Sequence, residues 1–244
     1  MGVKALGIII ARAGSKGLPN KCVRELLGRA VIEYTFDHAK NSERLTGIVL
    51  TTDSKPAKAL ARGVGIDVVD RPADLATDTA TVDAAARHAV ETWEAIHEQW
   101  VHIVALLYGN IPVRATGLID RAIDHLERTG ASSVRSVAPV SKQHPDWLHR
   151  LDGDRMTPLR PNSIYRRQDL SPLHYHDGAV AVVTRAALFG ALDTPDDHQA
   201  FLGPDRRAIV QNPEEAVDID GPVDLLVAEA ILRARRERSI NASK

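Results

Sequence analysis

Hydrophobic and polar positions follow two patterns along the chain. Continuous apolar runs, such as "ALGIII" and "GIVLTT", are bounded by glycine or polar residues. Such runs are typical of strands that are buried on both faces of a parallel sheet. The segments between them carry apolar residues three and four positions apart, as in "VDAAARHAVETW", which predicts amphipathic helices. The alternation predicts three layers, with helices on both faces of one sheet.

The expected elements cover most of the chain. Predicted strands lie at residues 5–10, 47–54, 66–72, 101–109, 131–140, 178–184 and 206–211. Predicted helices lie at residues 30–42, 55–65, 79–100, 116–130 and 222–239. The segment 141–172 interrupts this alternation because it is polar, basic and rich in proline. We interpret it as an excursion within a single domain that spans residues 1–244.

Composition narrows the classes of function. The chain has 31 Lys plus Arg against 32 Asp plus Glu, so its formal charge of −1 offers no global attraction for nucleic acid or a membrane surface. Aromatic residues make up 4% of the chain, which does not favour a base-stacking surface. The single cysteine, Cys22, excludes an intramolecular disulfide. No stretch has the length of a membrane span or the pattern of a signal peptide, and we expect a cytoplasmic protein.

The loop "ARAGSKGLPNK" directly follows the first predicted strand. Ligands of open α/β sheets bind beyond the carboxyl ends of the strands, where such loops lie. Gly14 and Gly17 permit close approach of the backbone, and Arg12, Lys16 and Lys21 can form charge-assisted hydrogen bonds with phosphate oxygens. The spacing is neither a Walker A loop nor a dinucleotide fingerprint. The loop predicts a polyphosphate site, with a solvated turn as the alternative.

Two carboxylates near the C-terminus suggest a metal site. Asp218 and Asp220 lie two positions apart in "VDID", so on a strand end both would face the same side. Carboxylate oxygens are suitable ligands for a hard divalent cation. A solvated pair of surface carboxylates is the alternative.

A basic cluster and a histidine pair allow further interpretations. The segment "RRQD", residues 166–169, could bind an acidic sugar or hold a subunit contact, because arginine pairs with carboxylates bidentately. A cluster of surface salt bridges is the alternative. His174 and His176 have no third ligand at suitable spacing, so zinc is not expected. The chain also lacks a GxSxG nucleophile elbow.

Several motifs together resemble one enzyme family. "IIIARAGSKGLPNK", "IVLTTDS", "DRPADLATDTATVDAA", "YRRQDLSPLHYHDGAVAV" and "VDIDGPVDL" occur in this order. They are similar to segments of the acylneuraminate cytidylyltransferases, the CMP-sialic acid synthetase family, over roughly residues 5 to 235. The resemblance implies a three-layer α/β/α nucleotidyltransferase fold, Rossmann-like, with a mixed sheet. It also implies a homodimer in which the excursion contributes to the partner's active site.

The family transfers CMP from CTP to a 2-keto sugar acid and uses Mg²⁺. By resemblance, the catalytic residues are Arg12, Lys21, Asp218 and Asp220, the last two as metal ligands. The nucleotide-binding positions are Ala11, Arg12, Gly14, Ser15, Lys16, Lys21, Cys22, Arg71 and Thr81. The acceptor-binding positions are Tyr108, Asn110, Arg167, Gln168, Asp177, Gly178 and Ala181.

This chain departs from the family pattern at five of these positions. Cys22 replaces an asparagine, Tyr108 a glutamine, Asn110 a threonine, Asp177 an asparagine and Ala181 a tyrosine. Four of the changes lie on the acceptor side. A site built for one set of hydroxyl groups rejects a ligand that leaves buried partners unpaired. The changes therefore indicate an acceptor that differs from N-acetylneuraminate.

Three functions remain open at this point. The first is CMP transfer from CTP to the anomeric hydroxyl of an acidic, sialic-acid-like nonulosonic sugar, with release of pyrophosphate, for surface glycan synthesis. The second is the same reaction with a Kdo-like or other sugar acid. The third is a nucleotide-binding homologue with weak or no catalysis, suggested by Cys22 and the altered "YGN" stretch. A nicotinamide oxidoreductase is not favoured because the dinucleotide glycine pattern is missing.

Overall fold

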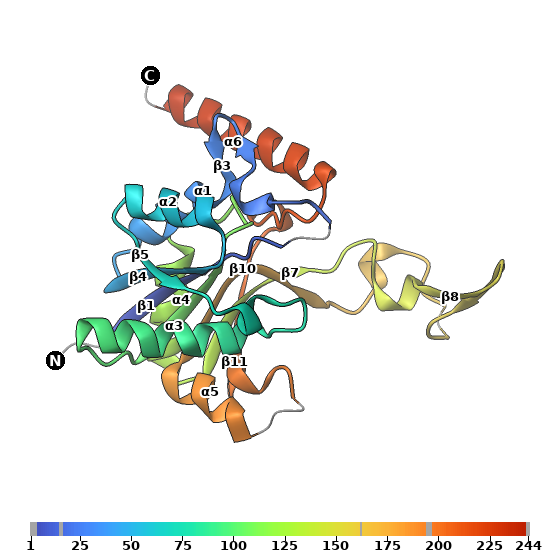
Figure 1. Cartoon of the computed structure of the whole chain (residues 1–244). Coiled ribbons are helices and arrows are strands. Elements are labelled where there is room, and N and C mark those ends of the chain that lie inside the picture. The colour runs from blue at the N-terminus through green and yellow to red at the C-terminus, as the bar shows by residue number, and fades with distance from the viewer. Residues whose placement is uncertain (1–3, 15–16, 162, 194–196, 243–244) are drawn as a thin grey trace.

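Seven strands form one mixed sheet at the centre of the protein (Figure 1). The computed structural model describes residues 4–14, 17–161, 163–193 and 197–242. The spatial order of the strands is β11-β7-β10-β6-β1-β4-β5. They are β1 (Ala5–Ile10), β4 (Gly47–Thr52), β5 (Asp67–Asp70), β6 (Ile103–Tyr108), β7 (Ser133–Pro139), β10 (His174–Thr184) and β11 (Arg206–Val210). The predicted α/β class is confirmed.

One strand gives the sheet its mixed character. β10 runs antiparallel to both β6 and β7, whereas the other pairings in this sheet are parallel. It begins at His174, four residues before the predicted start, and its register against β7 shifts between His176 and Ala181. The apolar run could not reveal this direction, because a strand buried on both faces has the same pattern in either orientation.

Helices cover both faces of the sheet. They are α1 (Val31–Lys40), α2 (Lys55–Gly63), α3 (Val82–His97), α4 (Leu118–Thr129) and α5 (Arg185–Gly190), whereas α6 (Pro222–Ala242) belongs to a separate cluster. One buried cluster joins α1, α2 and α4 to Ile9 and Leu107, and a second joins α3 and α5 to Ile8 and Leu106. Neighbouring residues of one strand therefore belong to opposite cores, which explains the continuous apolar runs.

The boundaries of α3 follow from its end residues. The Thr81 side chain accepts a hydrogen bond from the Ala84 amide and caps the helix, so α3 begins three residues after the predicted start. Glu98 adopts a left-handed backbone conformation with φ of 52°, which ends the helix at His97. The predicted extension to residue 100 is wrong for this reason.

A third apolar cluster places the C-terminal helix beside the first loop. α6 packs on the short hairpin of β2 (Glu25–Leu26) and β3 (Arg29–Ala30), as Figure 1 shows. Leu18 of the glycine-containing loop and Ile219 between the two predicted metal ligands both belong to this cluster. Apolar packing thus brings the two segments together that carry the predicted phosphate and metal sites.

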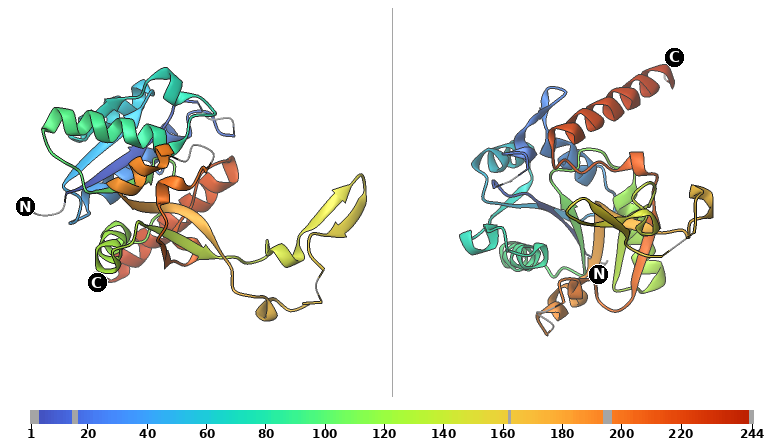
Figure 2. Two further views of the ribbon diagram at one scale, coloured as in Figure 1. Left: turned by 90° about the horizontal axis from the view of Figure 1, so that it is seen from below. Right: turned by 90° about the vertical axis from the view of Figure 1, so that its right-hand side faces the viewer.

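An arm leaves the sheet between β7 and β10 (Figure 2). It carries a hairpin of β8 (His149–Asp152) and β9 (Arg155–Pro158), and it contains the whole predicted excursion, 141–172. Large apolar side chains on it are exposed, among them Leu151 at 71% and Met156 at 62%. None of the helices in the described residues is both long and apolar enough to cross a membrane.

A buried arginine joins three elements at the carboxyl end of β6. Arg114 is 1% exposed. Its guanidinium donates to the Ala179 carbonyl oxygen at 2.7 Å, to Thr35 Oγ1 at 2.9 Å and to the Tyr108 carbonyl oxygen at 2.7 Å. Burial lowers the pKa of Arg114 to about 9, so the group remains protonated at neutral pH. These contacts fix the loop after β6 against α1 and β10.

His38 lies near this arginine, and its pKa is lowered. Its Nε2 is 3.3 Å from the Pro112 carbonyl oxygen. Burial, and then the charge of Arg114, lower the pKa of His38 from 6.5 to about 4. The unfolded chain therefore takes up a proton at this residue before the folded protein does. His38 favours the folded state at neutral pH, and this contribution is lost as the pH falls from about 6.5 towards about 4.

We expect His38→Gln to flatten the pH dependence of stability. Between pH 7 and pH 5 the wild-type free energy of unfolding should fall by about 1–2 kcal/mol more than that of the variant. Urea unfolding at both pH values measures this difference. His149→Gln, which removes an exposed histidine from the arm, is the matched control. Equal pH dependence in wild type and His38→Gln would contradict the prediction.

Candidate functional site

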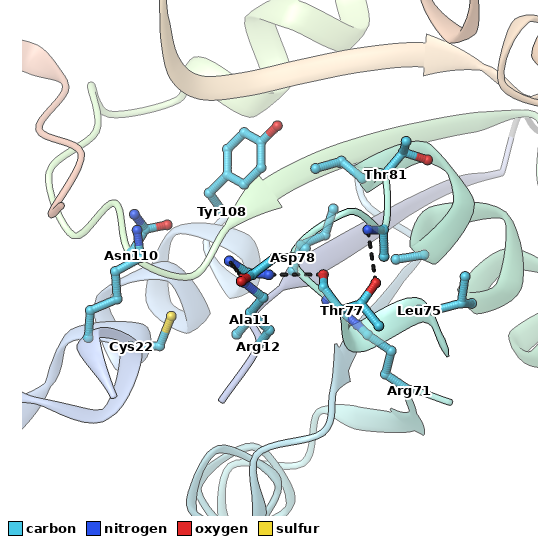
Figure 3. A pocket seen from close by; sticks show the side chains of 15 residues that line it. Ala11, Arg12, Cys22, Arg71, Leu75, Thr77, Asp78, Thr81, Tyr108 and Asn110 are labelled. Atoms are coloured by element: carbon cyan, nitrogen blue, oxygen red, sulfur yellow. Dashed lines mark hydrogen bonds and ion pairs between the residues drawn. The ribbon is translucent and has the colours of Figure 1, made fainter. Parts of the chain in front are cut away.

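A cleft of about 290 Å³ lies at the carboxyl end of β1 and β6 (Figure 3). These strands neighbour each other, and the chain runs from β1 to β4 on one side and returns through β6 on the other. Such a crevice is the usual ligand position of open α/β sheets. Eight of the predicted site residues line it: Ala11, Arg12, Lys21, Cys22, Arg71, Thr81, Tyr108 and Asn110.

Two contacts, at Ala13 and at Gly17, fix the position of the loop after β1. The Ala13 amide donates to Asp53 Oδ1 at 2.7 Å, which ties the loop to the end of β4. Gly17 lies against the other predicted segment, because a Cβ atom at this position would come within 2.5 Å of the Asp220 carbonyl oxygen. Glycine is required there by close approach of two backbones. The predicted phosphate-loop residues Ser15 and Lys16 lie outside the described residues, while Gly14 has open space around its Cα atom.

The two described cations of the loop each contact an acidic segment. Arg12 donates to the Thr77 carbonyl oxygen at 2.9 Å and forms an ion pair with Asp78 at 2.9 Å (Figure 3). Lys21 Nζ lies 2.6 Å from Asp220 Oδ1. All four ionic side chains keep some solvent exposure, so these pairs can exchange partners at small free-energy cost. Both cations can therefore turn to an anion bound in the cleft.

Arg71 and Thr81 line the cleft and also support its walls. The Arg71 guanidinium donates to the Thr51 carbonyl oxygen at 2.8 Å, and burial lowers the pKa of Arg71. Thr81 caps α3, and Val82 and Ala85 from the first turn of this helix also line the cleft. Burial raises the pKa of the Cys22 thiol to about 11, which leaves it protonated and a poor nucleophile.

The acidic pair reaches the cleft through Asn110 and Lys21. Asn110 Nδ2 donates to Asp218 Oδ1 and, at 3.1 Å, to the Ile219 carbonyl oxygen. The Ile219 amide returns a hydrogen bond to the Asn110 carbonyl oxygen at 3.0 Å. Partial loss of hydration, and next the negative charge of Asp220, raise the pKa of Asp218. Two like charges therefore face one region at the edge of the cleft.

The predicted acceptor residues fall into three places. Tyr108 and Asn110 line the cleft. Gly178 lies beside them with φ of 74°, and a Cβ there would come within 2.9 Å of Ile111 Cδ1, so glycine is required. Ala181 is buried in the core on β10. Asp177 is also buried.

The Asp177 carboxylate is engaged in contacts within the protein. It accepts hydrogen bonds from Ser136 Oγ, from the Ala179 amide at 3.0 Å and from Gln211 Nε2 at 2.6 Å. These contacts hold β10 to β7 and β11 at the place where the register shifts. The carboxylate therefore stabilises the irregular part of β10.

Arg167 and Gln168 are not brought to the cleft by this chain. They lie in a short 3-10 turn, η4 (Arg167–Asp169), on the arm. Neither residue is among those that line the cleft. Arg166 forms an i,i+3 ion pair with Asp169 at 3.6 Å, which is the contact that the surface-cluster alternative predicts.

A family model described as cytidylyltransferase matches residues 6–176. This chain belongs to the cytidylyltransferase family. It is 29% identical over 240 residues to the CMP-N,N'-diacetyllegionaminic acid synthase of Legionella pneumophila, covering 96% of this chain and 99% of that protein. It is 33% identical over 184 residues to the N-acylneuraminate cytidylyltransferase of Streptococcus agalactiae, where the match covers 74% of this chain and 43% of that longer protein. The resemblance inferred from the motifs is confirmed.

Solved cytidylyltransferases share the fold. A CMP:2-keto-3-deoxy-manno-octonic acid synthetase complexed with CTP superposes with a TM-score of 0.71 at 16% identity, covering 95% of this chain and 99% of that one. A 4-diphosphocytidyl-2C-methyl-D-erythritol synthase superposes with a TM-score of 0.68 at 14% identity, covering 95% and 99%. At these identities the similarity establishes the fold alone.

Sequence reasoning missed several residues that shape this cytidylyltransferase-family cleft. Thr77 and Asp78 hold Arg12, and Asp53 holds the loop backbone. Of these, only Asp53 could be found from the sequence, because it lies at the end of the predicted strand 47–54. Arg135, on β7, is half-buried and faces a second cavity at the edge of the site. A single arginine in a predicted strand carries no signal for such a position.

Proposed function

We propose that this protein transfers CMP from CTP to the anomeric hydroxyl of an acidic 2-keto sugar of the nonulosonic class, releasing pyrophosphate. The observation that carries the proposal is the pair of contacts Lys21–Asp220 and Asn110–Asp218. The first contact joins the loop after β1 to the acidic segment, and the second joins the loop after β6 to the same segment, at one edge of the cleft. Phosphoryl transfer depends on such positioning and on charge stabilisation around the phosphates.

The triphosphate would take over the cationic side chains of the loop. Arg12 and Lys21 would exchange the carboxylates of Asp78 and Asp220 for phosphate oxygens. Both side chains line the cleft, and their present ion pairs are solvent-accessible. A charge-assisted hydrogen bond to phosphate is stronger than an exposed ion pair between side chains. The negative charge of the leaving pyrophosphate would thereby be compensated.

Asp218 and Asp220 fit a divalent cation, and we propose that they hold Mg²⁺. The raised pKa of Asp218, caused by partial desolvation and then by Asp220, reflects negative charge that Lys21 only partly compensates. Within the described residues no cluster of three metal-binding side chains is found. Mg²⁺ takes one or two protein carboxylates together with phosphate oxygens and water, and Asp218 and Asp220 would supply the carboxylates. When bound, the ion would neutralise phosphate oxygens.

The acceptor would approach from the side of Tyr108 and Asn110. Its anomeric oxygen forms a bond to the α-phosphorus, the bond from that phosphorus to the pyrophosphate oxygen breaks, and the hydroxyl proton is released to solvent. The named relatives act with legionaminic and acylneuraminic acids, which favours a nonulosonic acceptor. A Kdo-like acceptor is the second candidate. It is supported by 33% identity over 119 residues to a 3-deoxy-manno-octulosonate cytidylyltransferase of Bdellovibrio bacteriovorus.

We expect pyrophosphate release with CTP, Mg²⁺ and at least one acid from a panel of N,N'-diacetyllegionaminate, N-acetylneuraminate and Kdo. A coupled pyrophosphate assay measures turnover, and UTP, ATP and GTP in place of CTP test the base. Asp220→Ala should lower turnover by roughly a hundredfold or more, because charge compensation at the phosphates is lost. Glu91→Ala, which removes an exposed carboxylate from α3, should leave it unchanged.

Two results would count against the proposal. The absence of pyrophosphate with every acid and nucleotide would contradict catalysis, and CTP binding without turnover would favour the nucleotide-binding homologue. Turnover in Asp220→Ala with an unchanged dependence on Mg²⁺ concentration would contradict the metal assignment. A thermal melt of each variant separates loss of folding from loss of function.

We further propose that the protein is a homodimer joined through the arm. Leu151, Met156 and Tyr165 are 71%, 62% and 92% exposed, so the arm offers apolar surface for a partner. The arm also carries Arg167 and Gln168, which do not line the cleft of their own chain.

Light scattering should give twice the mass of one chain. The double variant Leu151→Asp, Met156→Asp should shift the mass to that of a monomer, whereas a monomeric wild type would contradict the proposal.

A further inference from the structure

Arg135 is a half-buried cation whose guanidinium has no hydrogen-bond or ion-pair partner within the described part of the chain. It lies on β7 between two buried residues, Val134 and Ser136. Burial lowers the pKa of Arg135, which reflects the loss of hydration around the charge. A partly desolvated guanidinium without a partner is costly, and it is stabilised when an anion binds to it.

Arg135 lines a cavity of about 220 Å³ beside the proposed metal ligands. His176, Gly178 and Asp218 line the same cavity. Tyr108, which lines the nucleotide cleft, interacts electrostatically with Arg135. Asp218 lines this cavity and Tyr108 interacts with Arg135, so the cavity adjoins the place where the phosphates of CTP would lie.

Asp177, an acidic residue of the same cavity, already has hydrogen-bond partners within the protein. Asp177 lines the cavity, but its two carboxylate oxygens accept hydrogen bonds from Ser136, Ala179 and Gln211. It contributes electrostatically to Arg135 without forming an ion pair with it. The cavity thus retains a cation that can accept a further anionic group.

The neighbouring side chains leave room for that group. Ala181 is the direct cross-strand partner of Arg135, and cross-strand partners lie side by side on one face of a sheet. Its side chain is small and is buried in the core, so no longer side chain from this position covers Arg135. His176, at the rim of the cavity, has a lowered pKa because of burial and the charge of Arg135, so it is neutral at physiological pH.

We propose that Arg135 binds the carboxylate of the acceptor sugar in this second cavity. The inference rests on the proposed function and names the group through which the acceptor is recognised. In a 2-keto sugar acid the carboxylate is attached to the anomeric carbon, next to the hydroxyl that attacks phosphorus. A carboxylate on Arg135 would therefore leave that hydroxyl near Asp218 and the α-phosphate. The bidentate geometry of guanidinium suits a carboxylate.

The test compares a sugar acid with its uncharged C1 amide. Equilibrium binding of both is measured by calorimetry in the presence of Mg²⁺ and a non-hydrolysable CTP analogue, and turnover is measured in parallel with CTP. Wild type should bind the acid at least tenfold more tightly than the amide. In Arg135→Gln this preference should disappear, while affinity for the CTP analogue stays the same. Arg135→Lys should retain part of the preference.

Arg207→Gln is the matched control, because it removes the same charge from an exposed, ion-paired arginine on the neighbouring strand β11. It should keep the full preference for the acid. Turnover with an unchanged acid preference in Arg135→Gln would overturn the role of Arg135 and leave the proposed function intact. Acid binding that depends on Arg135, without turnover in wild type, would support Arg135 and overturn the proposed function. Failure of the wild type to bind any acid of the panel would overturn both.

Discussion

The ion pair between Lys21 and Asp220 joins segments 199 residues apart in the chain. The apolar cluster of Leu18, Ile219 and α6 brings the two segments together, and Gly17 allows their backbones to touch. The pair places a cation and a carboxylate where a nucleotide's phosphates and a metal ion would meet. Both side chains are solvent-accessible, so breaking their ion pair costs little free energy. An anion can then bind Lys21, and a divalent cation can bind Asp220. The proposed chemistry depends on this proximity.

Buried polar groups hold the surrounding loops in place. Arg114 binds carbonyl oxygens from the end of β6 and from β10, and Asp177 joins β10 to β7 and β11. Removing one partner from such a network leaves unpaired charge in the interior, which is strongly destabilising. Tyr108, whose carbonyl oxygen Arg114 binds, lines the cleft, and Asp177 lines the cavity around Arg135. These contacts therefore keep the walls of the cleft and of the cavity in a constant relative position.

The sequence predicted the sheet and its helices because their burial produces strong periodic patterns. It also predicted that the first loop and the acidic pair lie together, and the structure places Lys21 against Asp220. It could not predict that Asp177 is engaged by Ser136 and Gln211, since those contacts arise from the register shift of β10. The position of Arg167 on the arm and the unpaired state of Arg135 likewise depend on tertiary structure. Local patterns therefore revealed the phosphate side of the site better than the acceptor side.

The central claim is that the glycine-containing loop and the acidic segment together bind a metal–nucleotide complex. The most direct measurement is a crystal structure of the protein with a non-hydrolysable CTP analogue and Mg²⁺. We predict that Lys21 leaves Asp220 and contacts a phosphate oxygen, while Asp218 and Asp220 contact the metal ion. A nucleotide bound with its phosphates away from Lys21, or a metal ion that contacts neither carboxylate, would contradict it.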